Sequence, residues 1–174
     1  MRRRDLLAGA AAGFASGCGY ALQGRGVTTD PTIKRIGVPL FKDRSGKLGL
    51  DSRVTQAVME ELLKRGRVTV VREASGVAAV VEGEIVAYNA LPVNYSSDTG
   101  TTQATRYAIS MTARVVYRKI GQQEPIWANE AFSQRDEYDM GQDPSNYFDR
   151  EEQSIERLSA GFARNLVAAM LEAF

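Results

Sequence analysis

The sequence predicts an α+β fold, a two-layer sandwich in which a mixed β-sheet carries two helices on one face. Two segments, 50–66 and the residues after about 150, have apolar side chains at helical spacing, whereas several others alternate between apolar and polar residues as strands do. The order is strand, helix, strand, then further strands and a last helix. This order favours a single two-layer domain with one core.

A first strand is predicted at 33–41. The alternation places Ile36, Val38 and Leu40 on one face, and Pro39 favours a strand that ends there or lies at a sheet edge. The polar, glycine-containing residues 42–49 are predicted to form a loop.

A helix is predicted at 50–66. Asp51 near its start and Lys64 and Arg65 near its end complement the helix dipole. A buried stripe is expected from Leu50, Val54, Ala57, Val58 and Leu62. A short strand at 67–72 follows, and so short a strand-helix-strand connection places the two strands parallel in one sheet.

The later strands, at 77–91, 105–119 and 126–135, are predicted to form an antiparallel meander. In the first of them, alternation places Glu82, Glu84 and Tyr88 on one face, opposite Val81 and Ile85. Residues 92–104, which include Asn94 and Tyr95, and residues 136–149 are expected to be loops.

The last helix is predicted to begin near Arg150, with Asp149 and Glu152 spaced like a capping box. Its apolar stripe is Ile155, Leu158, Phe162, Leu166 and Met170. Acidic residues in its first turn, such as Glu151, are explained by the helix dipole.

Residues 1–17 have the pattern of a secretory signal peptide. Three arginines precede an apolar stretch that is too short to span a bilayer as a helix. The ending Phe14–Cys18 resembles the lipobox of bacterial lipoproteins, which implies removal of the leader and attachment of lipid to Cys18. Gly19, instead of an aspartate, implies by the same resemblance a lipoprotein sent to the outer membrane.

The alternative for this region is an ordinary secretory signal that leaves Cys18 as a free thiol. The export route is also open, because Arg3 and Arg4 are similar to a twin-arginine signal and equally compatible with general secretion. We expect residues 18–32 to form a lipidated tether and residues 33–174 to form a single α+β domain.

Composition excludes several classes of function. Loss of residues 1–17 removes three arginines and one aspartate, so the net charge falls from +1 to −1, which gives no global field for holding nucleic acid. One cysteine and no histidine exclude a zinc cluster and a Cys-His pair. No phosphate-binding loop or nucleophile elbow is present, so we expect no catalytic residue, no metal and no cofactor.

The segment Cys18–Gly24 resembles the start of the LptE family of lipopolysaccharide-assembly lipoproteins. The resemblance extends through residues 33–41, 50–66, 80–85 and 107–118, and rests on the order and spacing of these segments. It implies a lipid-anchored protein on the periplasmic side of the outer membrane. Such a protein would bind lipopolysaccharide and act as plug and assembly partner of the β-barrel translocon LptD, without covalent chemistry.

Lipopolysaccharide is an anionic amphiphile, so a binder should offer cationic donors beside apolar surface. Arg106, Arg114 and Arg118 are the candidates, because even spacing places them on one face of the strand 105–119. The alternative is that they belong to a solvated sheet face.

A surface for the barrel wall should combine aromatic residues with arginine. Tyr138, Tyr147, Phe148 and Arg150 fit this description, and packing beneath the last helix explains them as well.

Two other functions remain as alternatives. One is an outer-membrane lipoprotein that regulates a peptidoglycan synthase through protein binding. The other is a periplasmic hydrolase with paired carboxylates such as Glu82 and Glu84, which would have to converge in a cleft.

Overall fold

The computed structural model describes residue 30 and residues 32–66, 68–96, 103–140 and 147–172. Six strands and two helices make up this part of the chain. In chain order they are β1 (Arg35–Gly37), β2 (Lys42–Asp43), α2 (Leu50–Gly66), β3 (Thr69–Val71), β4 (Ala79–Ser96), β5 (Gln103–Lys119), β6 (Trp127–Asp139) and α3 (Tyr147–Glu172).

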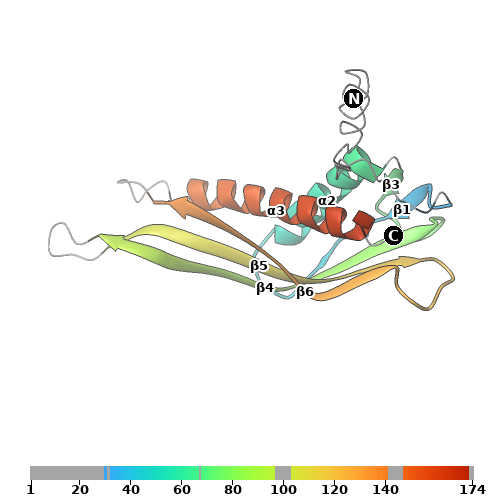
Figure 1. The fold of residues 1–174 in the computed structure, drawn as a ribbon. Helices are drawn as coiled ribbons and strands as arrows, with labels where there is room; N and C mark the ends of the chain where they lie inside the picture. The colour runs from blue at the N-terminus through green and yellow to red at the C-terminus, as the bar shows by residue number, and fades with distance from the viewer. Residues whose placement is uncertain (1–29, 31, 67, 97–102, 141–146, 173–174) are drawn as a thin grey trace, which may run out of the picture.

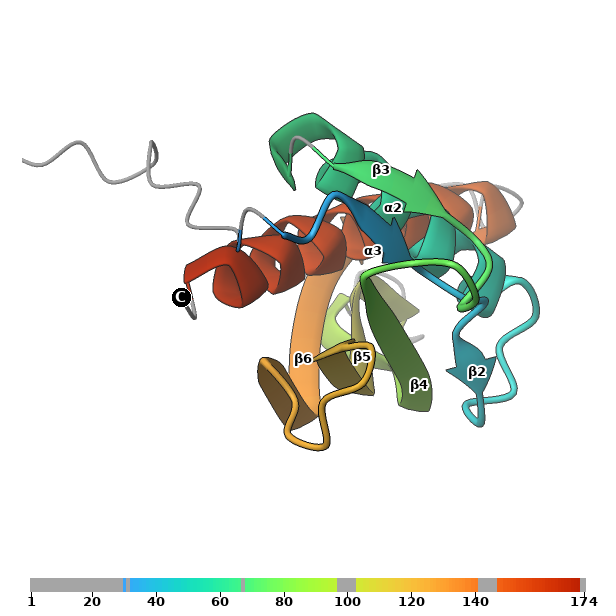
Figure 2. The same cartoon turned by 90° about the vertical axis from the view of Figure 1, so that its right-hand side faces the viewer.

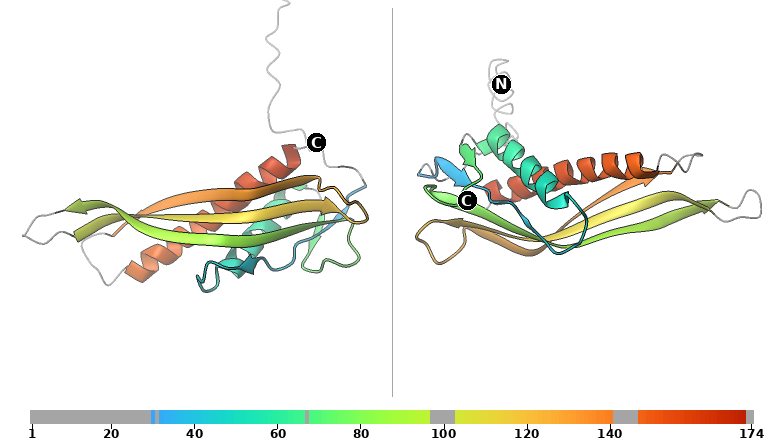
Figure 3. Two further views of the ribbon diagram at one scale, coloured as in Figure 1. Left: turned by 90° about the horizontal axis from the view of Figure 1, so that it is seen from below. Right: turned by 180° about the vertical axis from the view of Figure 1, so that it is seen from behind.

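The strands form one mixed sheet in the order β3-β1-β4-β5-β6, and β2 pairs separately with β4. β1 is parallel to both β3 and β4, whereas β4, β5 and β6 are antiparallel neighbours. The predicted parallel unit and the predicted meander are therefore confirmed. The three long strands β4, β5 and β6 give the molecule an elongated shape (Figures 1 and 3). The end of β4 and the start of β5 lie at one end of the molecule, and β1 lies near the other.

Both helices lie on the same face of the sheet, as predicted (Figure 2). α2 has the predicted bounds, and its stripe of Leu50, Val54, Val58 and Leu62 is buried. The stripe of α3 is buried against the same core, which also contains Ile85, Met111, Val115 and Tyr117 from the long strands. An α+β sandwich with one core is thus confirmed.

The prediction for residues 33–41 is wrong in part. The strand ends at Gly37, before Pro39, which has no N–H for a ladder. Leu40 is exposed, whereas Phe41 is buried and its ring lies over Gly83 of β4. The short strand β2 also lies within the segment predicted to be a loop.

The long strands extend further than predicted. β4 continues to Ser96 and β5 begins at Gln103, so Asn94 and Tyr95 lie in a strand rather than a loop. β6 continues to Asp139. These extensions are polar in sequence, so they were not predicted as strands. Beyond the helices the strands are less buried, and a strand there does not need an apolar face.

A bulge reverses the predicted faces in the second half of β4. The register shifts between Ile85 and Ala87, so Tyr88 is paired with the buried Met111. Tyr88 therefore lies on the helix side, where its hydroxyl donates to Oε1 of Glu151 at 2.9 Å, and not beside Glu82 and Glu84 as predicted.

α3 begins at Tyr147, which places Asp149 inside the first turn. The predicted capping box of Asp149 and Glu152 is therefore wrong, since its first residue must precede the helix. The predicted explanation for Glu151, the helix dipole, is also incomplete. It is buried and accepts a hydrogen bond from Lys47 Nζ at 2.9 Å in addition to that from Tyr88.

The predicted signal peptide, Cys18 and most of the predicted tether, residues 1–29, lie outside the described residues. Within the described part, neither helix is both long enough and apolar enough to cross a membrane.

Candidate ligand-binding site

The strand β5 positions the three predicted arginines on the sheet face that points away from the helices. Its odd-numbered residues, from Ile109 to Tyr117, are buried in the core, so the even-numbered residues face the other side. Arg106, Arg114 and Arg118 thus share a face, as predicted, but each has its own carboxylate partners.

Arg118 and Arg114 form cross-strand ion pairs with β4 and β6. Arg118 contacts both carboxylate oxygens of Glu82, at 3.2 and 3.4 Å. Arg114 donates to Oε2 of Glu130 at 2.5 Å and lies 3.5 Å from Oε2 of Glu84, which also pairs with Arg44. Glu82 and Glu84 are therefore paired with arginines, as expected of a polar sheet face and not of a catalytic dyad.

Arg106 lies opposite the end of β6. Its Nε donates to Oδ1 of Asp139 at 2.7 Å, and its Nη1 lies 3.9 Å from Oε2 of Glu137. This hydrogen bond, followed by the charge of its partner, raises the pKa of Arg106 and lowers the pKa of Asp139. Both groups therefore stay charged, and the guanidinium is held in place beside the end of the edge strand β6.

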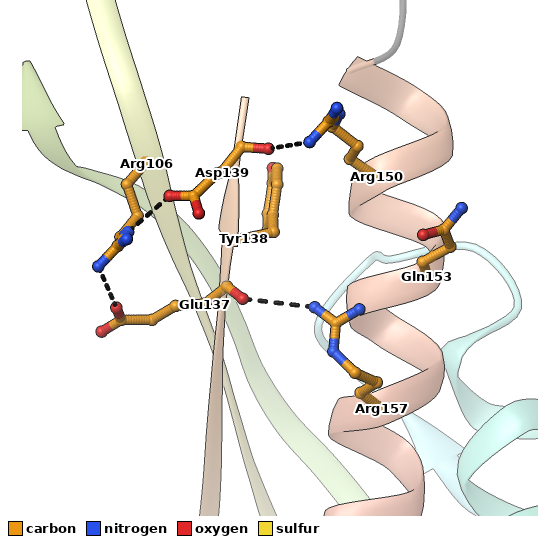
Figure 4. A pocket seen from close by; sticks show the side chains of 7 residues that line it. All are labelled: Arg106, Glu137, Tyr138, Asp139, Arg150, Gln153 and Arg157. Atoms are coloured by element: carbon orange, nitrogen blue, oxygen red, sulfur yellow. Dashed lines mark hydrogen bonds and ion pairs between the residues drawn. The ribbon is translucent and has the colours of Figure 1, made fainter. Parts of the chain in front are cut away.

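Helix α3 brings two further arginines to the end of β6 (Figure 4). Arg150 Nη1 donates to the backbone oxygen of Asp139 at 2.9 Å, and Arg157 Nη2 donates to that of Glu137 at 3.3 Å. Arg157 also pairs with Asp136 at 2.8 Å. Among the described strands β6 has one neighbour, β5, so these side chains satisfy carbonyls on its open edge.

The three arginines line a pocket of about 350 Å³ together with Glu137, Tyr138, Asp139 and Gln153. A guanidinium has five N–H donors, so one or two contacts leave donors for a ligand. The lining carries three cationic and two anionic groups. The pocket can therefore bind an anionic group through several N–H donors, as arginine does with phosphate.

Exposed apolar side chains lie beside Arg106 on the same sheet face. Leu91 is paired with Ala108, and Tyr95 is paired with Ala104, each two residues from Arg106 along β5. Leu91 is 63% exposed and Tyr95 is 59% exposed. This end of the sheet thus combines cationic donors with apolar surface.

A second pocket, of about 240 Å³, contains Arg114. Pro39, Leu40 and Val116 supply its apolar lining, and Lys42 is a second cation. Arg118 lines neither of these two pockets. The structure therefore separates the three predicted arginines instead of gathering them into one site.

The residues predicted to touch a barrel wall have different surroundings. Tyr138 is buried and stacks on Tyr107 with ring centroids 5.7 Å apart, so its packing role is the one that the structure supports. Phe148 is exposed, Arg150 lines the first pocket, and the side chain of Tyr147 lies outside the described residues.

Sequence reasoning did not find Arg157 and Gln153. The seven-residue spacing of Arg150 and Arg157 places them two turns apart on one helix face, which was a usable signal. Their meeting with Arg106 depends on the register of β5 with β6, and the sequence did not define where β6 ends. In the described part of the chain, no group of three or more cysteine, aspartate and glutamate residues is placed to hold a metal ion.

The family model for lipopolysaccharide assembly, LptE, matches residues 33–170. The chain belongs to the LptE family. Membership confirms the resemblance drawn from the sequence, and it assigns the chain to a non-enzymatic family of outer-membrane lipoproteins for lipopolysaccharide assembly. No curated protein sequence matches the chain.

Several solved structures have a fold similar to that of this chain. Rare lipoprotein B from Shewanella oneidensis is 16% identical, with a TM-score of 0.51 over 79% of this chain and 94% of that one. A hypothetical protein from Chlamydia trachomatis is 12% identical, with a TM-score of 0.53 over 81% and 97%. A Caulobacter crescentus protein described as a lipoprotein is 12% identical, with a TM-score of 0.52 over 76% and 88%. At these identities the likeness concerns the fold.

Proposed function

We propose that this LptE-family protein binds lipopolysaccharide and serves as plug and assembly partner of the β-barrel translocon LptD. The observation that carries the proposal is the pocket formed by Arg106, Arg150 and Arg157 beside exposed Leu91 and Tyr95. Phosphate groups of the glycolipid would bind the guanidinium groups, and an acyl chain would cover the apolar side chains. Arg114 and its pocket provide a second contact on the same face.

The anchor is part of the same proposal. Residues 1–17 act as a signal peptide, Cys18 carries the lipid, and residues 18–32 tether the domain to the periplasmic leaflet of the outer membrane. Two or more acyl chains give stable anchoring, because each buried methylene contributes about 0.8 kcal/mol. The pattern before Cys18 and the family membership support this arrangement.

Binding of lipopolysaccharide by the double variant Arg106→Ala with Arg150→Ala tests the pocket. Charged hydrogen bonds contribute about 1.5–3 kcal/mol each, so we expect the affinity to fall at least tenfold. Arg118→Ala is the matched control, since it removes an arginine from the same sheet face outside the pocket.

Lipopolysaccharide without its phosphates provides a second comparison. It should bind the wild type weakly, with the same affinity as it has for the double variant. An unchanged affinity in the double variant, or an equal loss in Arg118→Ala, would contradict a phosphate site at this pocket.

A further inference from the structure

The described domain begins with a small polar cluster that lies before the first strand. Asp30 Oδ1 accepts hydrogen bonds from the backbone N–H and the hydroxyl of Thr32, at 2.9 and 2.7 Å. Asp30 Oδ2 accepts from Lys119 Nζ at 2.7 Å, and the same ammonium donates to Thr32 Oγ1 at 2.8 Å. The backbone oxygen of Asp30 accepts from the N–H of Ile33 at 2.8 Å.

These contacts join parts of the fold that the sheet order separates. The chain enters the sheet at β1, whereas Lys119 is the last residue of β5 and lies on the other side of β4. The segment that contains Asp30 and Thr32 therefore reaches across the end of β4. Asp30 and Lys119 are 89 residues apart in the sequence, so local turn formation does not account for their contact.

The pair is also better protected from solvent than an ordinary surface ion pair. The side chains of Lys119 and Asp30 are 28% and 30% exposed. Partial burial reduces screening by salt, and the ammonium is held by two acceptors at once.

We propose that Asp30, Thr32 and Lys119 form a clamp that fixes the point at which the N-terminal tether leaves the domain. The inference rests on the proposed lipid at Cys18 for its purpose, although the clamp itself is a property of the folded domain. Ile33 is buried and holds the chain at this end of the sheet, and the clamp sets its exit beside the end of β5.

The exit point of the tether matters because the tether is short compared with the sheet. The segment from Cys18 to Asp30 reaches at most about 40 Å when fully extended and roughly 20 Å on average as a flexible coil. β5 contains 17 residues and is therefore roughly 55 Å long. Because the average reach is shorter than the sheet, the end that releases the tether lies near the membrane. Arg106 lies near the opposite end of β5, which begins at Gln103.

Hydrogen exchange of the full mature lipoprotein in lipid vesicles tests the clamp. In Asp30→Ala and Lys119→Ala, the amides of Thr32 and Ile33 should exchange roughly three- to tenfold faster than in the wild type, whereas core amides of β5 stay unchanged. Lys34→Ala is the matched control, because it removes an exposed cation from the same end of the domain. The double variant should exchange about as fast as the Asp30→Ala variant, because Asp30→Ala already removes both the ion pair with Lys119 and the acceptor of the Thr32 N–H.

Wild-type exchange of these two amides in both single variants would overturn the clamp, as would equally fast exchange in Lys34→Ala. Flotation of the vesicles separates this result from the proposed anchor. Protein that does not float with the lipid, while its Thr32 and Ile33 amides remain protected, would refute lipid attachment and leave the clamp intact.

Discussion

Leu62 and Leu63 are neighbours on α2 with opposite surroundings. Leu62 is 1% exposed and packs in the core, whereas Leu63 is 54% exposed. Leu62→Asp should destabilise the fold by about 4 kcal/mol or more, because it places an unpaired carboxylate in the core and removes a packed side chain. Leu63→Asp should change stability by less than about 1 kcal/mol. Chemical denaturation of both variants checks this, and a normal unfolding curve for Leu62→Asp would contradict the helix face.

Gly83 provides a place for the ring of Phe41. A Cβ atom at Gly83 would lie only 2.1 Å from Cε2 of that ring, so a larger residue must displace it. Gly83→Ala should cost about 1–3 kcal/mol through overpacking. Combining it with Phe41→Leu should cost less than the two single changes together, because the smaller side chain makes room for the methyl group. Strictly additive losses of unfolding free energy would show that the two residues do not compete for space.

Asp30 gives the molecule a defined pH response. Hydrogen bonds from Lys119 and then from Thr32 lower its pKa from 3.8 to about 2. A carboxyl group whose pKa is lower in the folded state stabilises that state above about pH 4, and this contribution is lost as the pH falls from about 4 towards 2. The carboxyl resonance of Asp30 in NMR should titrate near pH 2 in the wild type and move towards 3.8 in Lys119→Ala. A titration midpoint near 3.8 in the wild type would show that Asp30 does not make these contacts with Lys119 and Thr32.

At the residue scale, the sequence was enough to predict some residues of the pocket and not others. Alternation along 105–119 was enough to place Arg106 on the outer face. The pocket also needs Arg157 and Gln153 from a helix that is far away in sequence, and alternation contains no information on where that helix crosses the sheet. Tyr138 shows the same limit, since its place in the core depends on the register of β6 with β5.

At the element scale, Glu151 joins the start of α3 to the loop before α2 and to β4. Its carboxylate accepts from Lys47 and Tyr88, and its side chain is 10% exposed. Glu151→Ala should cost about 2 kcal/mol, because it removes two hydrogen bonds to a charged group and leaves Lys47 without this partner.

Glu152 is the matched control for that change. Its side chain is 62% exposed and pairs with Arg53 at the surface, so Glu152→Ala should cost at most about 1 kcal/mol. Thermal unfolding of the two variants provides the measurement. Equal melting temperatures would show that Glu151 acts only through the helix dipole, as the sequence alone indicated.

The elements differ in how well the sequence defined them, for physical reasons. α2 had the predicted bounds because charged ends and an apolar stripe agree with each other. β4 was predicted too short because Pro92 interrupts it. Beyond Ile85 the described part of β4 pairs with β5 alone, so Pro92 can face an open edge where no N–H is required. The bulge after Ile85 has no mark in the alternation, and it exchanged the faces of the residues from Ala87 to Pro92, where the next register shift follows.

At the scale of the whole molecule, the proposed clamp and the arginine pocket lie towards opposite ends of β5, because Lys119 is its last residue and Arg106 lies near its start. If the lipid is attached at Cys18, the membrane and the proposed ligand site are therefore separated by most of the length of the domain. Cys18→Ala should leave an unlipidated form that is lost from the outer-membrane fraction. Membrane fractionation with detection of the chain checks this, and unchanged outer-membrane recovery would contradict the anchor.

The most direct test of the central claim is to purify the tagged, full-length protein from outer membranes in a mild detergent and to identify what is bound in stoichiometric amount. The proposed function predicts one copy of LptD per copy of this chain, with lipopolysaccharide retained by the wild type and reduced in the double variant Arg106→Ala with Arg150→Ala. Recovery of a peptidoglycan synthase in place of LptD, or of the chain without any barrel protein, would contradict it.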